Sequence, residues 1–333
     1  ALYKRNFMHP PRPDFPAVIA NTMRSASRQC LQKVYRSHFQ HWAPSTPSIH
    51  LHAGGAFACG LEVARRAFYE TGKDEANSLR DGLEALMKFY GSIVAPPTRS
   101  GDKSLENVIK AYDSYMQRYR LGLDPLKPHM VNGKAMVEFT FSIPTKVRHP
   151  QTGDPILYGG RSDMIGVMND TLWVTDEKTA SQLGETWASQ WDLDSQFTGY
   201  IAAAHLYGYP VAGALVRGVG LLKTKISHAE AIVNRSSWAI ERWWQQLHRD
   251  IKRMIQAWEE NYWDYALDKS ACAAYGGCEF VKPCGSPEPE GYFPIYFRQR
   301  KWNPLAKDSG ENLLANPELA RTLASPDLNV PGL

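Results

Sequence analysis

Two segments near the middle of the chain carry residue types and spacings that can share a metal ion. Asp163 ends the segment Gly-Gly-Arg-Ser-Asp, and Asp176 and Lys178 stand two residues apart further on. Both segments have strand-like patterns, and residues two apart on a strand share a face. Two carboxylates on adjacent strands can hold a hard cation such as Mg²⁺, which polarises a phosphoryl oxygen and generates hydroxide from bound water. A lysine beside them stabilises charge in the transition state.

The bare Asp…Asp-x-Lys pattern is common by chance, and taken alone it favours a surface hairpin with an ion pair. Gln196 and Tyr200 change that balance because they stand four residues apart on the next predicted helix and therefore share a face. There they can contact a phosphate or Lys178. Each of the two by itself also fits ordinary core packing.

The chain has five cysteines, of which three are evenly spaced. Cys272, Cys278 and Cys284 follow one another with five residues between them, and Cys30 lies far upstream. Clustered cysteines in a reducing compartment more often bind metal than form disulfides. Four thiolates suit a 4Fe–4S cluster, with zinc and unliganded thiols as the alternatives. Cys59 falls within a helical pattern and is expected to be a buried small side chain.

The elements that must position these residues follow from the apolar periodicity. Helices alternate with strands in the second half of the chain, which predicts an α/β core with a helical N-terminal elaboration and a cysteine-rich C-terminal end. After Cys284 the chain is expected to be extended, and residues 43–53 are expected to form a loop. We expect helices over 21–42, from about 54, over 75–90, 104–120, 187–207 and 237–262, and strands over 136–147, 156–167, 171–176 and 211–223.

Composition limits the class of protein. Apolar residues make up 43% of the 333 residues and charged residues 22%, which are ordinary values for a globular chain. No apolar run approaches the length of a membrane span, and residues 1–15 have no apolar segment typical of a secretory signal, so a cytoplasmic location is expected. The chain contains no Walker-type Gly-x4-Gly-Lys-Ser/Thr segment, so any ATP-driven motor would be another protein.

Positive charge is concentrated at the start of the chain. Residues 1–50 contain seven Lys or Arg and a single acid, so their net charge is +6. The net charge of the whole chain is +4, so the remainder carries −2. A basic segment of this kind fits contact with a phosphate backbone. A solvated basic face explains the charge equally well.

The order of three motifs resembles the RecB-family nuclease module of the PD-(D/E)XK superfamily. These motifs are Gly-Arg-Ser-Asp, then Asp-Glu-Lys-Thr, then Gln-x-x-x-Tyr. That family includes AddB-type and CRISPR-adaptation nucleases, and many phage recombination exonucleases are similar. The resemblance covers roughly residues 20–305 and implies a restriction-endonuclease-like mixed sheet flanked by helices. It further implies that Asp163 and Asp176 are ligands of Mg²⁺ or Mn²⁺ and that Lys178 is the catalytic lysine. The backbone carbonyl of Glu177 would also bind the metal. Gln196 and Tyr200 would lie next to the DNA.

The cysteines match the iron–sulfur branch of this family, in which one cysteine precedes the core and three follow it. The resemblance therefore implies that Cys30, Cys272, Cys278 and Cys284 hold a 4Fe–4S cluster, with zinc as the less favoured occupant.

The first motif of the family departs from its pattern. Ala58 stands where the metal-binding His would be, and Glu62, one turn further along, is a candidate oxygen ligand. A solvated helix carboxylate is an equal alternative for Glu62. His50 and His52 are close by but precede the glycines of the motif.

These observations predict a metal-dependent DNA exonuclease that acts in recombination, repair or phage genome processing. The alternative, favoured by Ala58, is a catalytically weakened DNA-binding or scaffold module. DNA is the expected partner, and a separate recombinase, single-strand-binding protein or helicase is a candidate for a second one. The expected location is the cytoplasm of a bacterium or of a phage-infected host. We expect a flexible basic arm over 1–20, one nuclease domain over 21–305 (helical part 21–130, catalytic core 131–235, long helix and cysteines 236–285), and an extended tail over 306–333.

Overall fold

A mixed β-sheet forms the centre of the computed structural model, which describes residues 12–46, 48–92, 102–222, 225–273, 277–301 and 303–305. Within these ranges seven strands form one sheet, in the order β1-β7-β8-β9-β10, with β3 and β6 also paired to β7. Strand β1 is parallel to β7 and β8 is parallel to β9, whereas the other pairs are antiparallel. The strands are β1 (Val18–Ile19), β3 (Lys127–Pro128), β6 (Val137–Arg148), β7 (Pro155–Met168), β8 (Thr171–Ala180), β9 (Ala214–Leu221) and β10 (Ile226–Val233). The expected α/β architecture is confirmed.

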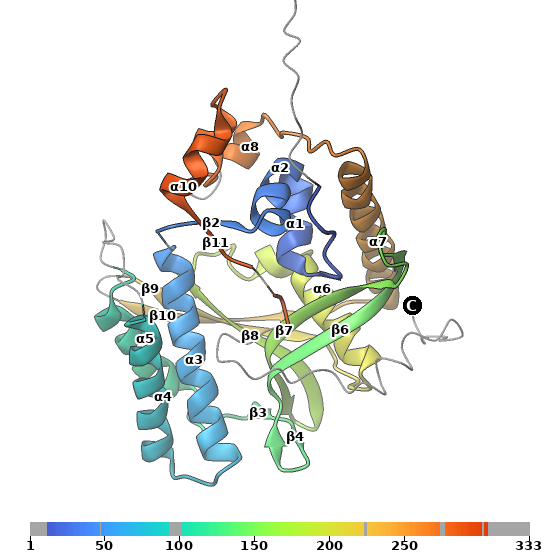
Figure 1. Cartoon of the computed structure of the whole chain (residues 1–333). Coiled ribbons are helices and arrows are strands. Elements are labelled where there is room, and N and C mark those ends of the chain that lie inside the picture. The colour runs from blue at the N-terminus through green and yellow to red at the C-terminus, as the bar shows by residue number, and fades with distance from the viewer. Residues whose placement is uncertain are drawn as a thin grey trace, which may run out of the picture.

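Helices cover both faces of this sheet because its central strands are apolar on both sides. Val216 of β9 packs with helices α1, α6 and α7, whereas Val219 of the same strand packs with α3, α4 and α5. The two groups of helices are separate in Figure 1, at the upper right and the lower left respectively. Their bounds are α1 (Asn21–Gln29), α3 (Ile49–Tyr69), α4 (Glu75–Tyr90), α5 (Leu105–Arg118), α6 (Ser195–Leu206) and α7 (Ser237–Glu259).

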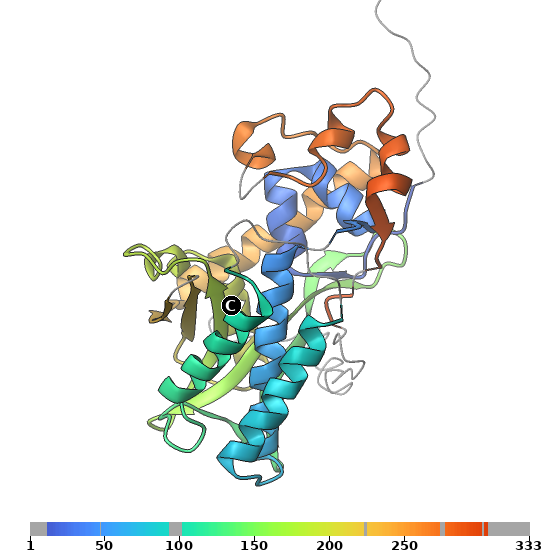
Figure 2. The ribbon, with the colours of Figure 1, turned by 90° about the vertical axis from the view of Figure 1, so that its left-hand side faces the viewer.

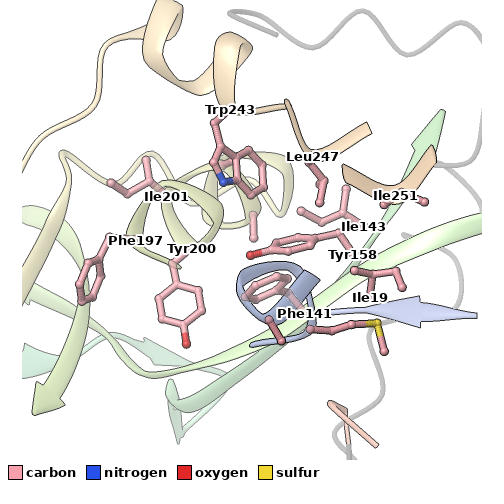
Figure 3. Close-up of a cluster of buried hydrophobic side chains, with 14 of the residues drawn as sticks. Ile19, Phe141, Ile143, Tyr158, Phe197, Tyr200, Ile201, Trp243, Leu247 and Ile251 are labelled. Carbon is pink, nitrogen blue, oxygen red and sulfur yellow. The ribbon is translucent and has the colours of Figure 1, made fainter. Parts of the chain in front are cut away.

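Aromatic side chains fill the core between β6, β7, α6 and α7. The rings of Tyr158 and Trp243 lie 5.1 Å apart at their centroids, and those of Phe141 and Tyr200 lie 5.8 Å apart. Figure 3 shows Trp243 above Tyr158, with Phe197 and Tyr200 projecting from α6. This packing holds α6, which carries Gln196 and Tyr200, against the strands that carry the acidic residues.

Side-chain caps decide where several helices begin. Asp74 accepts a hydrogen bond from the backbone of Asn77, and α4 spans the residues predicted for it. Asp194 caps α6 in the same way, so that helix begins at Ser195 and not near 187 as the periodicity predicted. A carboxylate at this position satisfies amide groups that otherwise lack partners.

The predicted helix over 21–42 is wrong as one element. Cys30 has extended backbone angles (φ −164°, ψ 120°), so α1 ends there and a short helix α2 (Leu31–Val34) begins, followed by a π-helical turn, Tyr35–Phe39. Helix α3 begins five residues earlier than expected, at Ile49, inside the predicted loop. Strand β10 was not predicted at all.

The segment after Cys284 is not simply extended, as the sequence predicted. It contains a 3₁₀ turn (Pro289–Tyr292), helix α10 (Phe293–Tyr296) and strand β11 (Phe297–Gln299), which pairs with β2 (Trp42–Pro44). Phe280, Phe293 and Phe297 form a small core of their own with Trp42 packed against it. Figure 2 shows these C-terminal elements, in orange, over α1 and α2, in blue.

The prediction of a flexible arm over residues 1–20 is wrong for the end of that segment. Val18–Ile19 forms β1, and Phe15 and Ile19 are buried in the main core. Residues 1–11 and the predicted tail, residues 306–333, lie outside the described residues. Among the helices that the structure describes, none is both long enough and apolar enough to span a bilayer.

Candidate active site

The sheet opens between β7 and β8 at the two predicted aspartates. Pairing of these strands runs from Met168–Thr171 to Met164–Thr175 and stops there, one residue before Asp163 and Asp176. On their outer sides the strands continue to pair, β7 with β6 and β8 with β9. The two carboxylates therefore stand side by side where the strands separate.

Asp163 binds a backbone amide of β8 beyond the point where the pairing of β7 with β8 ends. Its carboxylate accepts a hydrogen bond of 2.6 Å from the backbone N–H of Glu177. Burial raises the pKa of Asp163 well above its usual range, and the nearby carboxylates of Asp176, Glu177 and Glu138 raise it further. An acid in this position is poorly stabilised in its charged form, and a bound cation would stabilise that form.

Asp176, Lys178, Gln196 and Tyr200 form a connected chain of polar groups. The Lys178 ammonium forms an ion pair with Asp176 and donates to Gln196 Oε1 at 3.2 Å, and Gln196 Nε2 donates to the Tyr200 hydroxyl at 2.7 Å. Burial opposes the charge of Lys178, but the carboxylates of Asp176 and Asp163 outweigh it and raise its pKa. The predicted contact between Gln196 and Lys178 is confirmed.

Glu177 serves a different purpose from its two neighbours. Its side chain projects to the opposite face, where it accepts from Arg65 of α3 at 2.5 Å and from the Tyr115 hydroxyl of α5 at 3.0 Å. Although burial raises the pKa of Glu177, Arg65 outweighs it and lowers that pKa to about 2. This buried ion pair ties β8 to two helices. The role predicted for the Glu177 backbone carbonyl stays a prediction.

Glu138 is a further acid of this site that the motifs in the sequence did not indicate. It is the only acid in β6, it is buried, and its φ of +58° lies in the left-handed region that non-glycine residues rarely adopt. Its carboxylate pairs with Arg161 at 2.5 Å and raises the pKa of Asp163. A lone acid in this strand was a signal in the sequence, but its burial and its left-handed backbone were not.

Helix α3 carries Ala58 and Glu62, the two residues that were compared with the first motif of the family. Glu62 forms an ion pair of 2.9 Å with Arg66, which also donates to the backbone carbonyl of Val137, next to Glu138. Helix α3 thus reaches β6 beside the acidic cluster. His52 is engaged elsewhere, because its Nε2 lies 2.8 Å from the backbone oxygen of Tyr90.

The four predicted ligand cysteines do not form a cluster among the described residues. Cys272 ends helix α8 (Lys269–Cys272), Cys284 ends α9 (Val281–Cys284), and the Cys278 amide donates to the Cys272 carbonyl at 2.8 Å. Burial raises the pKa of Cys284 to about 11, and the thiols of Cys278, Cys30 and Cys272 add to the shift. Cys59 lies apart from them in α3, where it is half-buried.

Neither set of residues forms a finished metal site. Within the described part of the chain, no three His, Cys, Asp or Glu side chains converge closely enough to hold an ion. The donor types nevertheless fit, since Asp163 and Asp176 are hard carboxylate ligands with raised pKa values and the cysteines are soft thiol ligands.

Two arginines of the basic N-terminal segment are structural. Arg24 is buried and pairs with Asp250 at 2.6 Å, and Arg36 is buried and pairs with Glu290 at 2.7 Å. Neither is available to a phosphate backbone. Arg28, whose side chain is half exposed, and Arg12 face solvent.

Comparisons with known proteins do not identify a family. No protein-family model matches the chain, and no curated protein matches it. The chain is similar to a solved structure, the crystal structure of SSO0001, with a TM-score of 0.26 and 12% sequence identity over 71% of this chain and 86% of that one. A TM-score of this size does not establish a shared fold, so the resemblance to the RecB family stays a prediction.

Proposed function

We propose that this protein is a metal-dependent nuclease that hydrolyses phosphodiester bonds in DNA. The observation that carries the proposal is the placement of Asp163 and Asp176 at the opening between β7 and β8, with Lys178 next to them. Two buried acids whose pKa values are raised have no evident purpose in stabilising the sheet. Groups perturbed in this way are typical of functional sites.

Asp163 and Asp176 would hold Mg²⁺ or Mn²⁺, with Glu138, Glu62 and the Glu177 carbonyl as further candidates. The metal, when bound, supplies Lewis acidity toward the phosphoryl group and lowers the pKa of water.

The remaining chemistry belongs to the residues of the chain itself. Lys178 keeps its proton because two carboxylates flank it, so it can stabilise negative charge that develops on the phosphate. Gln196 holds the lysine in place from α6, and Tyr200 holds Gln196. The Glu177–Arg65 pair fixes the strand between Asp176 and Lys178. This arrangement is preorganised, which is the property that most lowers a barrier of this kind.

We also propose that Cys30, Cys272, Cys278 and Cys284 hold a 4Fe–4S cluster, with zinc as the rival occupant. Three of these cysteines lie in one short C-terminal stretch, where the Cys278 amide donates to the Cys272 carbonyl at 2.8 Å, which supports the proposal. Lys33 and Glu279, which follow Cys30 and Cys278, form an ion pair at 3.6 Å and keep the two chain segments together. A cytoplasmic location, and a separate recombinase, single-strand-binding protein or helicase as partner, are further parts of this proposal.

The proposal is tested with linear and circular DNA in the presence of Mg²⁺ or Mn²⁺. Wild-type protein should degrade DNA, and Asp176→Ala should abolish cleavage while the fold survives. Lys178→Ala should lose about 100-fold or more in rate, as loss of a transition-state contact does, yet still bind Mn²⁺ in a titration. Wild-type-like cleavage by Asp176→Ala would contradict the assignment. Binding without cleavage by the wild type would favour the DNA-binding module instead.

A further inference from the structure

A cavity of about 420 Å³ lies beside the acidic site. Gln196 and Tyr200 line it, and Gln196 also binds Lys178, so the cavity and the catalytic lysine share one wall. Arg300 and Lys301, which follow β11, also line it and form what we call its basic wall. Arg161 of β7 also lines it. We call this feature the basic cavity.

The charged side chains that line the basic cavity are all positive. It is lined by three cationic side chains, and none of its described lining residues is Asp or Glu. Arg161 is partly neutralised by Glu138. Arg300 and Lys301 are exposed, and neither takes part in an ion pair between described residues. Two uncompensated cations facing a cavity favour an anionic ligand.

The start of α1 adds to this potential. Ala20, Asn21 and Thr22 line the basic cavity, and α1 has no side-chain cap at its N-terminus. The first amide groups of a helix lack partners within it and carry the positive end of the helix dipole. Phosphate groups are common ligands at such positions.

The position of the basic wall is determined by the fold. The backbone N–H of Arg300 donates to the carbonyl of His41 at 2.8 Å, which continues the pairing of β11 with β2. Beyond it the chain crosses β7 at Gly159, where a Cβ atom would lie only 2.8 Å from the side chain of Leu305. Glycine at this position lets the segment approach, so Arg300 and Lys301 are held over the strand that carries Asp163.

We propose that the basic cavity binds a phosphate group of the nucleic-acid strand, next to Lys178. This inference rests on the proposed function and names the part of the substrate that the site holds. The ligand is a phosphate ester, either the monophosphate at a strand end or a diester within the strand. Arg300 and Lys301 supply its charge recognition, and the amides of α1 supply hydrogen bonds.

The test measures binding separately from cleavage. Labelled single-stranded oligonucleotides with a 5′-phosphate, a 3′-phosphate or only hydroxyl ends are titrated with protein in EDTA at several salt concentrations. The variant is R300Q/K301Q. The matched control is K252Q/R253Q, which removes the same charge from two adjacent exposed residues of α7 outside the cavity. Melting temperatures confirm that both variants are folded.

R300Q/K301Q should bind about tenfold more weakly at low salt, and the salt dependence of log K should decrease by about 0.7 for each phosphate that the variant no longer neutralises. A reduced affinity confined to one phosphorylated end identifies a terminal monophosphate, whereas an equal reduction for all strands identifies an internal diester. Wild-type binding by R300Q/K301Q, an equal reduction in the control, or no binding by the wild-type protein would overturn the inference. A wild-type protein that binds in this way but cleaves nothing would overturn the nuclease proposal alone.

Discussion

At the scale of single residues, Asp163 is where the proposed activity would conflict with stability. Its raised pKa means that ionisation at neutral pH costs folding free energy. The stability associated with its protonated form is fully present below the ordinary pKa of an aspartate and is lost as pH rises through the raised value. The contribution of Asp163 to the stability of the metal-free protein should therefore be least favourable at neutral and higher pH.

Asp163→Asn should stabilise the metal-free protein at pH 7 by on the order of 1 kcal/mol, because the amide carries no charge and still accepts from Glu177. The same change should abolish cleavage. Urea unfolding in EDTA at pH 7 and pH 5 measures the difference, which should shrink at the lower pH. If the wild type is the more stable protein at pH 7, the repulsion inferred for this site is wrong.

Glu138 and Glu62 offer a matched comparison, because each is an acid paired with an arginine. Glu138→Gln should raise the Mg²⁺ concentration needed for half-maximal cleavage by about tenfold, an energy of about 1.4 kcal/mol, since Glu138 adds negative charge near Asp163. Glu62→Gln should have the smaller effect. Metal titrations of the cleavage rate decide the order, and a larger effect at Glu62 would assign the ligand role to α3.

At the scale of elements, strand β8 is attached to the helices behind it by one buried ion pair. Arg65 of α3 and Glu177 of β8 are both almost fully buried, and Tyr115 of α5 completes the contact. Removing one member leaves a buried charge without its partner, which is more costly than removing both.

Arg65→Met should therefore lower the free energy of unfolding by about 3–5 kcal/mol. The double variant R65M/E177M should recover much of that loss, because both charges are gone. Denaturant unfolding of the two variants and of the wild type measures this. Equal stability of the single and double variants would show that the pair does not brace β8.

At the scale of the whole molecule, the four predicted ligand cysteines come from opposite ends of the described chain. Cys30 lies between α1 and α2, and the other three lie in the C-terminal elements above them (Figure 2). A metal bound by all four would couple these segments, and its binding energy would become folding energy.

Protein purified without oxygen should accordingly be brown and contain iron and sulfide. Cys284→Ser should lose the colour and melt at a lower temperature, whereas Cys59→Ser, the matched control in α3, should keep both properties. Elemental analysis and thermal unfolding provide the measurements. Stoichiometric zinc without iron would leave the cysteine site intact but exclude the cluster.

Local rules of backbone geometry were enough to predict from the sequence which residues of the acidic site share a face. Residues two apart on β8 and four apart on α6 share faces by backbone geometry alone, so Lys178, Gln196 and Tyr200 meet as predicted. The bounds of α4 were also predictable, because Asp74 caps it within four residues of sequence. The α/β class was predictable because the spacing of apolar residues changes along the chain from that of helices to that of strands.

Tertiary contacts decided the rest. The left-handed backbone of Glu138, the burial of Arg65 and the pairing of β11 with β2 depend on segments far apart in sequence, and no local pattern encodes which segments meet. The same holds for Arg24 and Arg36, whose charges are neutralised by distant acids. Sequence determined which residues can do chemistry, and packing of remote segments decided which of them face the site, because burial and long-range ion pairs exist only in the folded chain.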